Sequence, residues 1–195
     1  MSNFLGAVVP CSREVTLFRF YRKEFTPQCA IPELTPGFEA ILWRPGQGRM
    51  VPFGCPLFPF LVWWAFHHLR IFTNRDYGVL LIVHHRKLVH RSLVTPRYFK
   101  FPFMATDDLQ IGDTWTDPAF RGRGLAGCAI GEIGQRLGAR SRAFWYVVHD
   151  ENAASIKVVE RLQFALVGRG HKQAPFRLPL LGRYAIDERH KQTTE

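Results

Sequence analysis

The fold of this chain is decided by the stretch Thr116-Asp117-Pro118-Ala119-Phe120-Arg121-Gly122-Arg123-Gly124-Leu125-Ala126. Before it, residues 109–115 alternate with a period of two, which predicts a strand. After it, apolar residues recur at helical spacing and Gly138 supplies a stop, which predicts a helix over 125–137. A strand that enters a helix through a short turn leaves several backbone N–H groups unpaired, at the positive end of the helix dipole. The stretch therefore predicts an anion-binding turn.

Two features beyond the glycines favour this interpretation, because glycines alone are equally typical of a plain strand–turn–helix connection. Arg121 and Arg123 stand at the start of the predicted helix, where cations are unfavourable unless they meet an anion. Downstream, residues 143–148 form a second strand-like run, which leads into a predicted helix that starts at Asn152 and closes on Phe164.

This combination resembles the GNAT superfamily of acyl-CoA-dependent N-acyltransferases. The resemblance rests on Arg-x-x-Gly-x-Ala between a strand and a helix, followed by a second strand and Asn-x-x-Ser at the next helix. It covers roughly the C-terminal half, and the N-terminal half resembles no family. It implies acetyl-CoA or another acyl-CoA as co-substrate, with the diphosphate in the turn and the pantetheine arm near Asn152. The implied cofactor-binding residues are Thr114, Trp115, Thr116, Arg121, Gly122, Arg123, Gly124, Leu125, Ala126, Asn152 and Ser155. Asn152 and Ser155 fit a helix N-cap pair equally well.

The whole chain has the composition of a globular protein. It has 195 residues, 47% hydrophobic and 22% charged, which suits one domain with a sizeable core. We expect an acceptor-side half over 1–106, an acyl-CoA-binding half over 107–168 and C-terminal strands with a tail over 169–195. The net charge of +10 predicts an anionic partner such as CoA, a nucleotide-linked substrate, nucleic acid or an anionic membrane. The Lys and Arg residues are scattered, which argues against a nucleic-acid-binding arm.

The cysteines and the N-terminus favour a cytoplasmic protein. The four cysteines lie far apart without a Cys-x-x-Cys pair, as expected for buried thiols in a reducing cytosol, and Cys128 fits a core position. Residues 1–10 lack the basic leading segment of a signal peptide. The apolar run over 55–66 is too short to span a membrane, so we expect a buried helix over 57–72, with contact at a membrane interface as the alternative. A homodimer is left open.

The remaining patterns complete an α/β (α+β) domain with a mixed, mostly antiparallel sheet flanked by helices, as the resemblance also implies. Alternation and turn signals predict strands over 14–22, 38–43, 78–84, 87–93, 164–168 and 181–186. Prolines predict loops over 25–36 and 95–104, and the polar residues 187–195 are expected to fray.

Acyl transfer to an amine needs a diphosphate cradle, a donor to the thioester carbonyl, a base and an acid. By resemblance the carbonyl donor is a backbone N–H at Thr114, Trp115 or Thr116, with Thr116 best placed. The glutamate that many members use as base is replaced by Gln110, which cannot accept the proton. Asp108 is then the first candidate and His90 the second, although a solvated carboxylate and a structural histidine are the plainer interpretations.

The residue at the position of the general acid also differs from the pattern of the GNAT superfamily. The position of the family's tyrosine holds Val159, a core residue type, so Tyr146 or a water is the candidate, and Tyr146 fits a packed aromatic equally well. Adjacent histidines at 67–68 and 84–85 point in different directions and lack a third ligand, so no metal is expected.

Three functions follow from these patterns. The first is an N-acyltransferase that acts on a small amine, such as an amino sugar or sugar nucleotide. Its aromatic-rich N-terminal half would then form the wall of the acceptor pocket or admit a longer acyl chain. The second is a CoA-binding module without catalysis, and the third is a basic protein that binds nucleic acid or a membrane surface.

Overall fold

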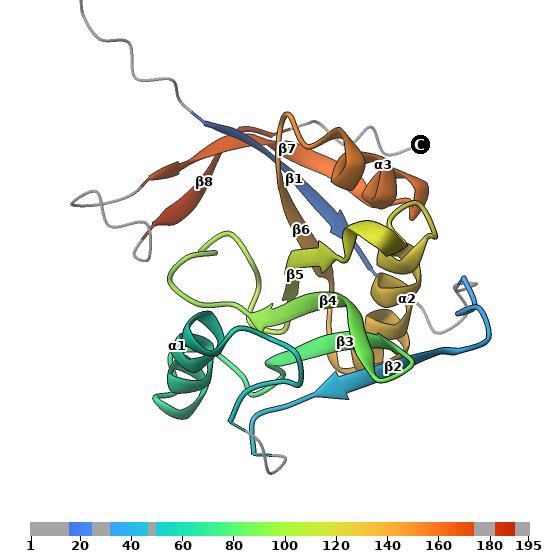
Figure 1. The fold of residues 1–195 in the computed structure, drawn as a ribbon. Helices are drawn as coiled ribbons and strands as arrows, with labels where there is room; N and C mark the ends of the chain where they lie inside the picture. The colour runs from blue at the N-terminus through green and yellow to red at the C-terminus, as the bar shows by residue number, and fades with distance from the viewer. Residues whose placement is uncertain (1–15, 25–31, 47–49, 174–181, 190–195) are drawn as a thin grey trace, which may run out of the picture.

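The fold is a single eight-stranded sheet with helices on both faces, in a computed structural model that describes residues 16–24, 32–46, 50–173 and 182–189 (Figure 1). The strands are β1 (Leu17–Lys23), β2 (Phe38–Trp43), β3 (Gly78–His84), β4 (Lys87–Pro96), β5 (Leu109–Thr116), β6 (Phe144–His149), β7 (Ala165–Gln173) and β8 (Arg183–Arg189). The helices are α1 (Leu57–His68), α2 (Leu125–Leu137) and α3 (Ala153–Arg161), with short 3-10 turns η1 (Pro118–Phe120) and η2 (Gly138–Arg140). The predicted mixed, mostly antiparallel α/β fold is confirmed.

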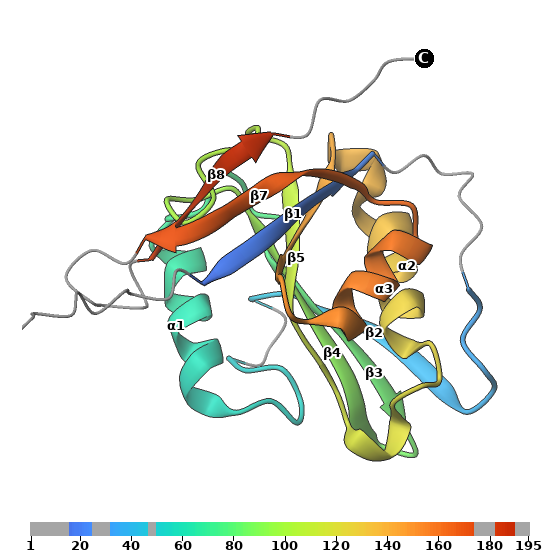
Figure 2. The same cartoon turned by 90° about the horizontal axis from the view of Figure 1, so that it is seen from above.

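The sheet separates two apolar cores. Figure 2 shows α1 on one face of the sheet and α2 and α3 on the other. Helix α2 buries a stripe of apolar side chains at helical spacing against β3, β4 and β5, as its sequence predicts. The face under α1 is lined mostly by aromatic side chains, among them Phe60, Tyr77, Tyr98 and Trp145. The two faces therefore offer different environments to side chains that alternate along β4 and β5.

The strand order β2-β3-β4-β5-β6-β1-β7-β8 contains one parallel pair, β5 with β6. Their pairing covers three residues on each strand and ends at Ile111 opposite Tyr146. Beyond that point β5 stays paired with β4 as far as Thr116, and β6 stays paired with β1 as far as His149. The ladder between β5 and β6 is thus open along the half that leads to η1 and α2.

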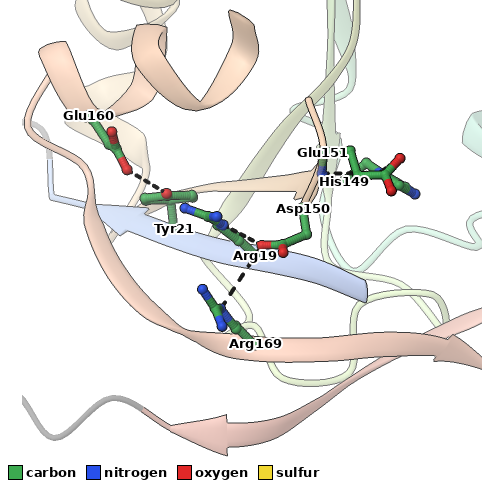
Figure 3. A network of polar contacts seen from close by, with 7 residues as sticks. All are labelled: Arg19, Tyr21, His149, Asp150, Glu151, Glu160 and Arg169. Carbon is green, nitrogen blue, oxygen red and sulfur yellow. Dashed lines mark hydrogen bonds and ion pairs between the residues drawn. The ribbon is translucent and has the colours of Figure 1, made fainter. Parts of the chain in front are cut away.

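Strand β1 is the first element in sequence, but it lies between β6 and β7 and pairs antiparallel with both. Side chains fasten it there (Figure 3): Arg19 forms an ion pair with Asp150 at the end of β6, and the Tyr21 hydroxyl donates to Glu160 of α3 at 2.9 Å. Arg169 of β7 lies 4.0 Å from the same Asp150 carboxylate. These contacts connect β1, the end of β6, β7 and α3.

Several predicted boundaries are wrong. The strand predicted over 164–168 continues as far as Gln173 in β7. The predicted loop over 95–104 begins later, because Thr95 and Pro96 extend β4 and pair with the start of β5. The predicted helix over 57–72 ends at His68, where the chain turns through Arg70 with φ +56°. Residues 187–189, expected to fray, belong to β8. They lie close to β7 because Gly168 has no side chain: a Cβ there would stand 2.0 Å from the Glu188 carbonyl oxygen.

Helix α1 is apolar all round, yet Phe60 is its one buried residue, and Phe58 is 77% exposed. The predicted burial of this helix is therefore realised on one side alone. In the described part of the chain, no helix is long and apolar enough to cross a membrane. The loop predicted over 25–36 and the cysteines Cys11 and Cys29 fall wholly or partly outside the described residues. Cys55 is half-buried and Cys128 buried, both as free thiols.

Candidate functional site

The turn between β5 and α2 has the geometry that an anion site requires. Gly122 and Gly124 adopt φ +77° and +75°, the left-handed region that favours glycine, and Gly124 is the N-cap of α2. No side chain caps this helix and its first turn carries no acidic residue. Among the described residues, no hydrogen bond to a protein acceptor is found for the amides of 122–127, while the N–H of Cys128 starts the helical pattern. The turn therefore presents free N–H groups at the positive end of α2.

Space and charge at the turn suit an anion. A Cβ built on Gly122 or Gly124 would meet nothing within 4 Å, so the region in front of the turn is open. Arg121 and Arg123 are exposed; the first donates from Nε to the Thr116 carbonyl at 3.3 Å, and the second lies 5.1 Å over the Phe120 ring. The one carboxylate of the turn, Asp117, pairs with Lys87 at 2.8 Å, and this contact lowers the pKa of Asp117.

A bulge in β5 lies just before this turn. Gly112 pairs with Leu93 and Trp115 with Arg91, so Asp113 and Thr114 together face a single residue of β4, Ser92. Asp113 takes φ +45°, which an aspartate tolerates better than most residues. The bulge falls in the part of β5 that is unpaired on its β6 side. It therefore changes the direction of side chains and amides next to the open part of the β5–β6 ladder.

A chain of polar side chains crosses the bulge on the α2 side of the sheet. The Tyr146 hydroxyl of β6 donates to Thr114 Oγ1 at 3.3 Å, and Thr114 Oγ1 lies 3.3 Å from Ser92 Oγ. His90 continues the chain, with Nε2 at 3.0 Å from Ser92 Oγ and Nδ1 at 2.8 Å from Thr116 Oγ1. The network thus joins four residues named from the sequence, Tyr146, His90, Thr114 and Thr116, through Ser92.

His90 is completely buried, and burial lowers the pKa of its imidazole to about 4. The ring is therefore neutral near pH 7. Both of its nitrogens are engaged with hydroxyl groups, so neither faces the open ladder. In this arrangement His90 holds Thr116 and Ser92 across the bulge.

Asp108 is placed at the other end of β5. It is buried, and its Oδ2 accepts from Trp145 Nε1 at 2.7 Å and from the Ala105 N–H at 2.9 Å. Its Oδ1 is also buried, without a partner among the described residues. These contacts tie β5, β6 and the preceding loop together. Gln110, at the position of the family's glutamate, accepts from Thr95 at 3.1 Å and donates to the Ile111 carbonyl at 2.8 Å.

The other predicted residues lie where helix α3 begins. Asn152 is the N-cap of α3, and its side chain accepts from the Ser155 N–H at 3.1 Å, so the predicted capping pair is confirmed. Val159, at the position of the family's tyrosine, is completely buried in the core under α2 and α3, as expected.

Two residues near the bulge were not singled out from the sequence. Asp113 projects from the bulge with its side chain 48% exposed, and desolvation raises the pKa of its carboxyl group. Arg91 of β4 lies on the α1 side, with Nη2 3.7 Å from Asp113 Oδ2. The available signals were a Gly-Asp step inside a strand, typical of a bulge, and an arginine in the interior of a predicted strand.

A pocket of about 510 Å³ lies away from this site. It is lined by Glu39, Ile41, Trp43, Phe53, Leu81, Val83 and Arg86, on the outer strands β2 and β3 and the neighbouring turns. Since none of these residues belongs to the turn or the bulge, the pocket does not define the site. In the described part of the chain no three His, Cys, Asp or Glu residues cluster as a metal site would require.

Comparison with known proteins supports the fold. No family model matches the chain, and no curated protein does either. Solved structures do match. A tandem GNAT protein from the clavulanic acid biosynthesis pathway aligns at TM-score 0.55 and 14% identity, over 79% of this chain and 51% of its own. A GCN5-related N-acetyltransferase from Sphaerobacter thermophilus aligns at TM-score 0.53 and 18% identity, over 80% and 50%.

An acetyltransferase from the GNAT family of Colwellia psychrerythraea aligns at TM-score 0.50 and 13% identity, over 80% of this chain and 54% of that protein. The chain therefore has the GNAT fold, and it spans about half the length of these solved structures. At such low identities the likeness establishes the fold and leaves the substrates to be inferred from the site.

Proposed function

We propose that the chain is an acyl-CoA-dependent N-acyltransferase, which moves an acetyl or other acyl group from CoA to a small-molecule amine. The proposal rests on two adjacent features, a helix N-terminus with free amides and a gap in the pairing of two strands. Unpaired amides stand at the N-terminus of α2, and the β5–β6 ladder is open directly before them. A diphosphate fits at the helix N-terminus, and a pantetheine arm fits between the two strands.

The residues of the turn fit the diphosphate of CoA. Glycines at positions 122 and 124 leave free the space that side chains would fill, and two exposed arginines add positive charge. The amides of Thr114, Trp115 and Thr116 belong to the half of β5 that is unpaired on its β6 side, and one of them, with Thr116 best placed, would polarise the thioester carbonyl there.

Asp113 and Tyr146 are the groups best placed for the proton transfers. The amine nitrogen attacks the thioester carbon and gives a proton to the half-exposed Asp113, while the C–N bond forms and the C–S bond breaks. The thiolate takes a proton from Tyr146, whose hydroxyl contacts Thr114 across the open ladder. Solvent then returns a proton to Tyr146 and removes one from Asp113. Asp108 and His90, the bases expected from the sequence, have contacts that suit structural roles.

A CoA-binding module without catalysis is the second candidate. It is favoured by Gln110 and Val159, which replace the glutamate and tyrosine of the resembled pattern. Release of CoA thiol in the presence of amines separates the two candidates, since a binding module stabilised by acetyl-CoA would release none.

The test of the proposal is acetyl-CoA binding by the wild-type chain and by Gly124→Glu. Acetyl-CoA at 100 times its dissociation constant should stabilise the wild type by about 2.7 kcal/mol. In Gly124→Glu, a carboxylate occupies the open space before the turn and repels the diphosphate, so binding should be lost.

Gly46→Glu is the matched control, because Gly46 is exposed, has φ +92° and likewise has no atom within 4 Å of a built Cβ. It carries the same backbone strain without lying at the site. Equal affinity in Gly124→Glu and Gly46→Glu would show that the turn does not bind the diphosphate.

A further inference from the structure

On the α1 face of the sheet, opposite the polar chain of His90, buried hydrogen-bond donors lack acceptors. The Nε of Arg91 and the hydroxyl of Tyr77 are both shielded from solvent and have no partner among the described residues. An unpaired buried donor costs about 1–3 kcal/mol, so two in one region call for an acceptor that the described residues do not supply.

The thiol of Cys55 interacts with Arg91. The pKa of Cys55 is raised to about 11, chiefly by burial, with smaller effects of Arg91 and Asp113, so Cys55 is a neutral thiol near pH 7. The pKa of Tyr77 is raised by burial and, to a lesser extent, by Cys55 and Asp113. A neutral thiol does not neutralise a guanidinium, so the positive charge of Arg91 remains available.

Arg91 is held in position by aromatic rings. Its guanidinium lies 5.4 Å from the Phe60 ring of α1 and 5.6 Å from the Trp115 ring of β5, and its side chain is 18% exposed. The contact with Asp113, at 3.7 Å, is too long for a two-pronged hydrogen-bonded pair. A guanidinium held in this position, with unused N–H donors in a planar fork, matches the two oxygens of a carboxylate.

We propose that the acceptor is an amine that carries a carboxylate on the adjacent carbon, of the α-amino acid class, with Arg91 binding its carboxylate. This inference rests on the proposed function, and it specifies the acceptor of that same site. Arg91 is paired with Trp115, next to the bulge, so a carboxylate on Arg91 leaves the neighbouring amine beside Asp113.

Charge balance selects this class over other anions. Arg91 and Asp113 form a loose pair of opposite charges, and a zwitterion completes it with one opposite charge for each. A phosphate dianion would meet the carboxylate of Asp113 at close range, and an amino sugar would leave the donors of Arg91 without a charged acceptor.

The decisive experiment compares amino acids with their carboxamides and decarboxylated amines, which keep the amine and remove the charge. With the wild-type chain and acetyl-CoA, kcat/KM for the best amino acid should exceed that for its carboxamide by about 100-fold. Glucosamine should be a poor acceptor. Equal rates for the amino acid and its carboxamide would overturn the inference.

Arg91→Gln tests the residue itself. It should raise KM for the amino acid about 100-fold, change the carboxamide little and leave KM for acetyl-CoA unchanged. Arg91→Lys keeps the charge without the fork and should recover part of the loss. Equal losses for amino acid and carboxamide would contradict the assignment. If Arg91→Gln fails to fold, the wild-type ratio alone decides.

Failure of the proposed function is recognised separately. If the chain binds no acyl-CoA, the N-acyltransferase assignment falls. Calorimetric binding of the same amino acids and carboxamides to the chain alone then decides the inference: selective binding of the amino acids supports it, and indifference to the carboxylate rules it out.

Discussion

At the scale of single residues, the chain holds its ionisable groups near the bulge in three settings. Asp113 is half exposed, Tyr146 is buried with its hydroxyl at the open ladder, and His90 is buried with both ring nitrogens engaged. Because a proton-transfer group must reach its partner, the first two suit chemistry and the third suits support. Each setting leads to a measurement.

Replacement of Asp113 by asparagine should lower kcat by about 100-fold or more, because the amide cannot take the proton of the amine. Asparagine tolerates the φ of +45° at this position, so the fold should persist. The pH–rate profile of the wild type should lose activity toward acid as Asp113 is protonated, and the variant should lack this limb. Asp108→Asn is the matched control. It disturbs a buried acceptor of two hydrogen bonds, so it should reduce stability while kcat stays near wild type.

Tyr146→Phe should lower kcat at least tenfold and leave KM for acetyl-CoA unchanged, because it removes the proton donor to the thiolate without altering the turn. Steady-state kinetics of thiol release measure both constants. Tyr98→Phe, which removes a buried hydroxyl on the opposite face, is the control and should retain activity. If Tyr146→Phe keeps the kcat of the wild type, a water and not Tyr146 protonates the thiolate.

His90 should make stability fall on acidification. Its pKa in the folded chain is about 4, below the ordinary 6.5, so the unfolded chain binds the proton more readily between these values. The stabilisation is complete above pH 6.5 and is lost progressively as the pH falls toward 4. The total is on the order of 3 kcal/mol, at 1.36 kcal/mol per pKa unit.

Urea unfolding of the wild type and His90→Gln at pH 7, 6 and 5 measures this effect. The variant is less stable at pH 7, and the difference should shrink by about 2 kcal/mol at pH 5. The other histidines titrate in both chains and cancel. A constant difference would mean that the pKa of His90 is the same in the folded and the unfolded chain.

At the scale of elements, the site depends on where strands stop pairing. The β5–β6 ladder is short because β5 turns away with β4 at the bulge, while β6 continues along β1. Strand β1 thus occupies the edge of β6 that faces β7, and it leaves the other edge open toward the turn. The charges that hold β1 therefore support the opening indirectly.

A double-mutant cycle on Arg19 and Asp150 tests this support. The two side chains are partly buried and form an ion pair between β1 and the end of β6 (Figure 3), so their coupling should be about 1 kcal/mol. Urea unfolding of Arg19→Met, Asp150→Asn and the double variant gives the value. The exposed pair Arg22–Glu24, two residues apart on one segment, should show coupling near zero. Equal coupling in both pairs would mean that the first does not fasten β1.

At the scale of the whole molecule, the first strand in sequence completes the sheet near its middle. Phe20 and Tyr21 of β1 are buried in opposite cores, so the strand supplies side chains to both faces of the sheet. Strand β1 therefore packs the N-terminal part of the chain against its C-terminal half on both faces of the sheet.

Deletion of residues 1–23 should abolish cooperative unfolding, because it exposes the facing edges of β6 and β7 and removes buried aromatic side chains from both cores. Circular dichroism during thermal denaturation follows the transition. A deletion of residues 190–195, which follow β8, should retain it. A sharp transition in the chain without β1 would show that the strand is dispensable.

Much of the fold could be predicted from the sequence. The helix over 125–137, the strand before it and the hairpin of β3 and β4 follow from local periodicity and turn residues. Boundaries failed where a partner strand decided them, as at Pro96 and at residues 187–189. The turn at Gly122 and Gly124 and the helix cap at Asn152 could be predicted because both are local. Arg91 and Asp113 were missed, since nothing near either in sequence reveals that they face each other.

The sequence by itself determined the turn, because two glycines, two arginines and the start of a helix lie within a few residues. The backbone conformation and hydrogen bonding of so short a segment depend on its own residues. The tertiary structure alone decided that β1 lies between β6 and β7, that His90 is buried neutral, and that Arg91 lies beside Asp113. These arrangements join residues tens of positions apart. Their free energy comes from burial and from pairing across strands, neither of which local periodicity encodes.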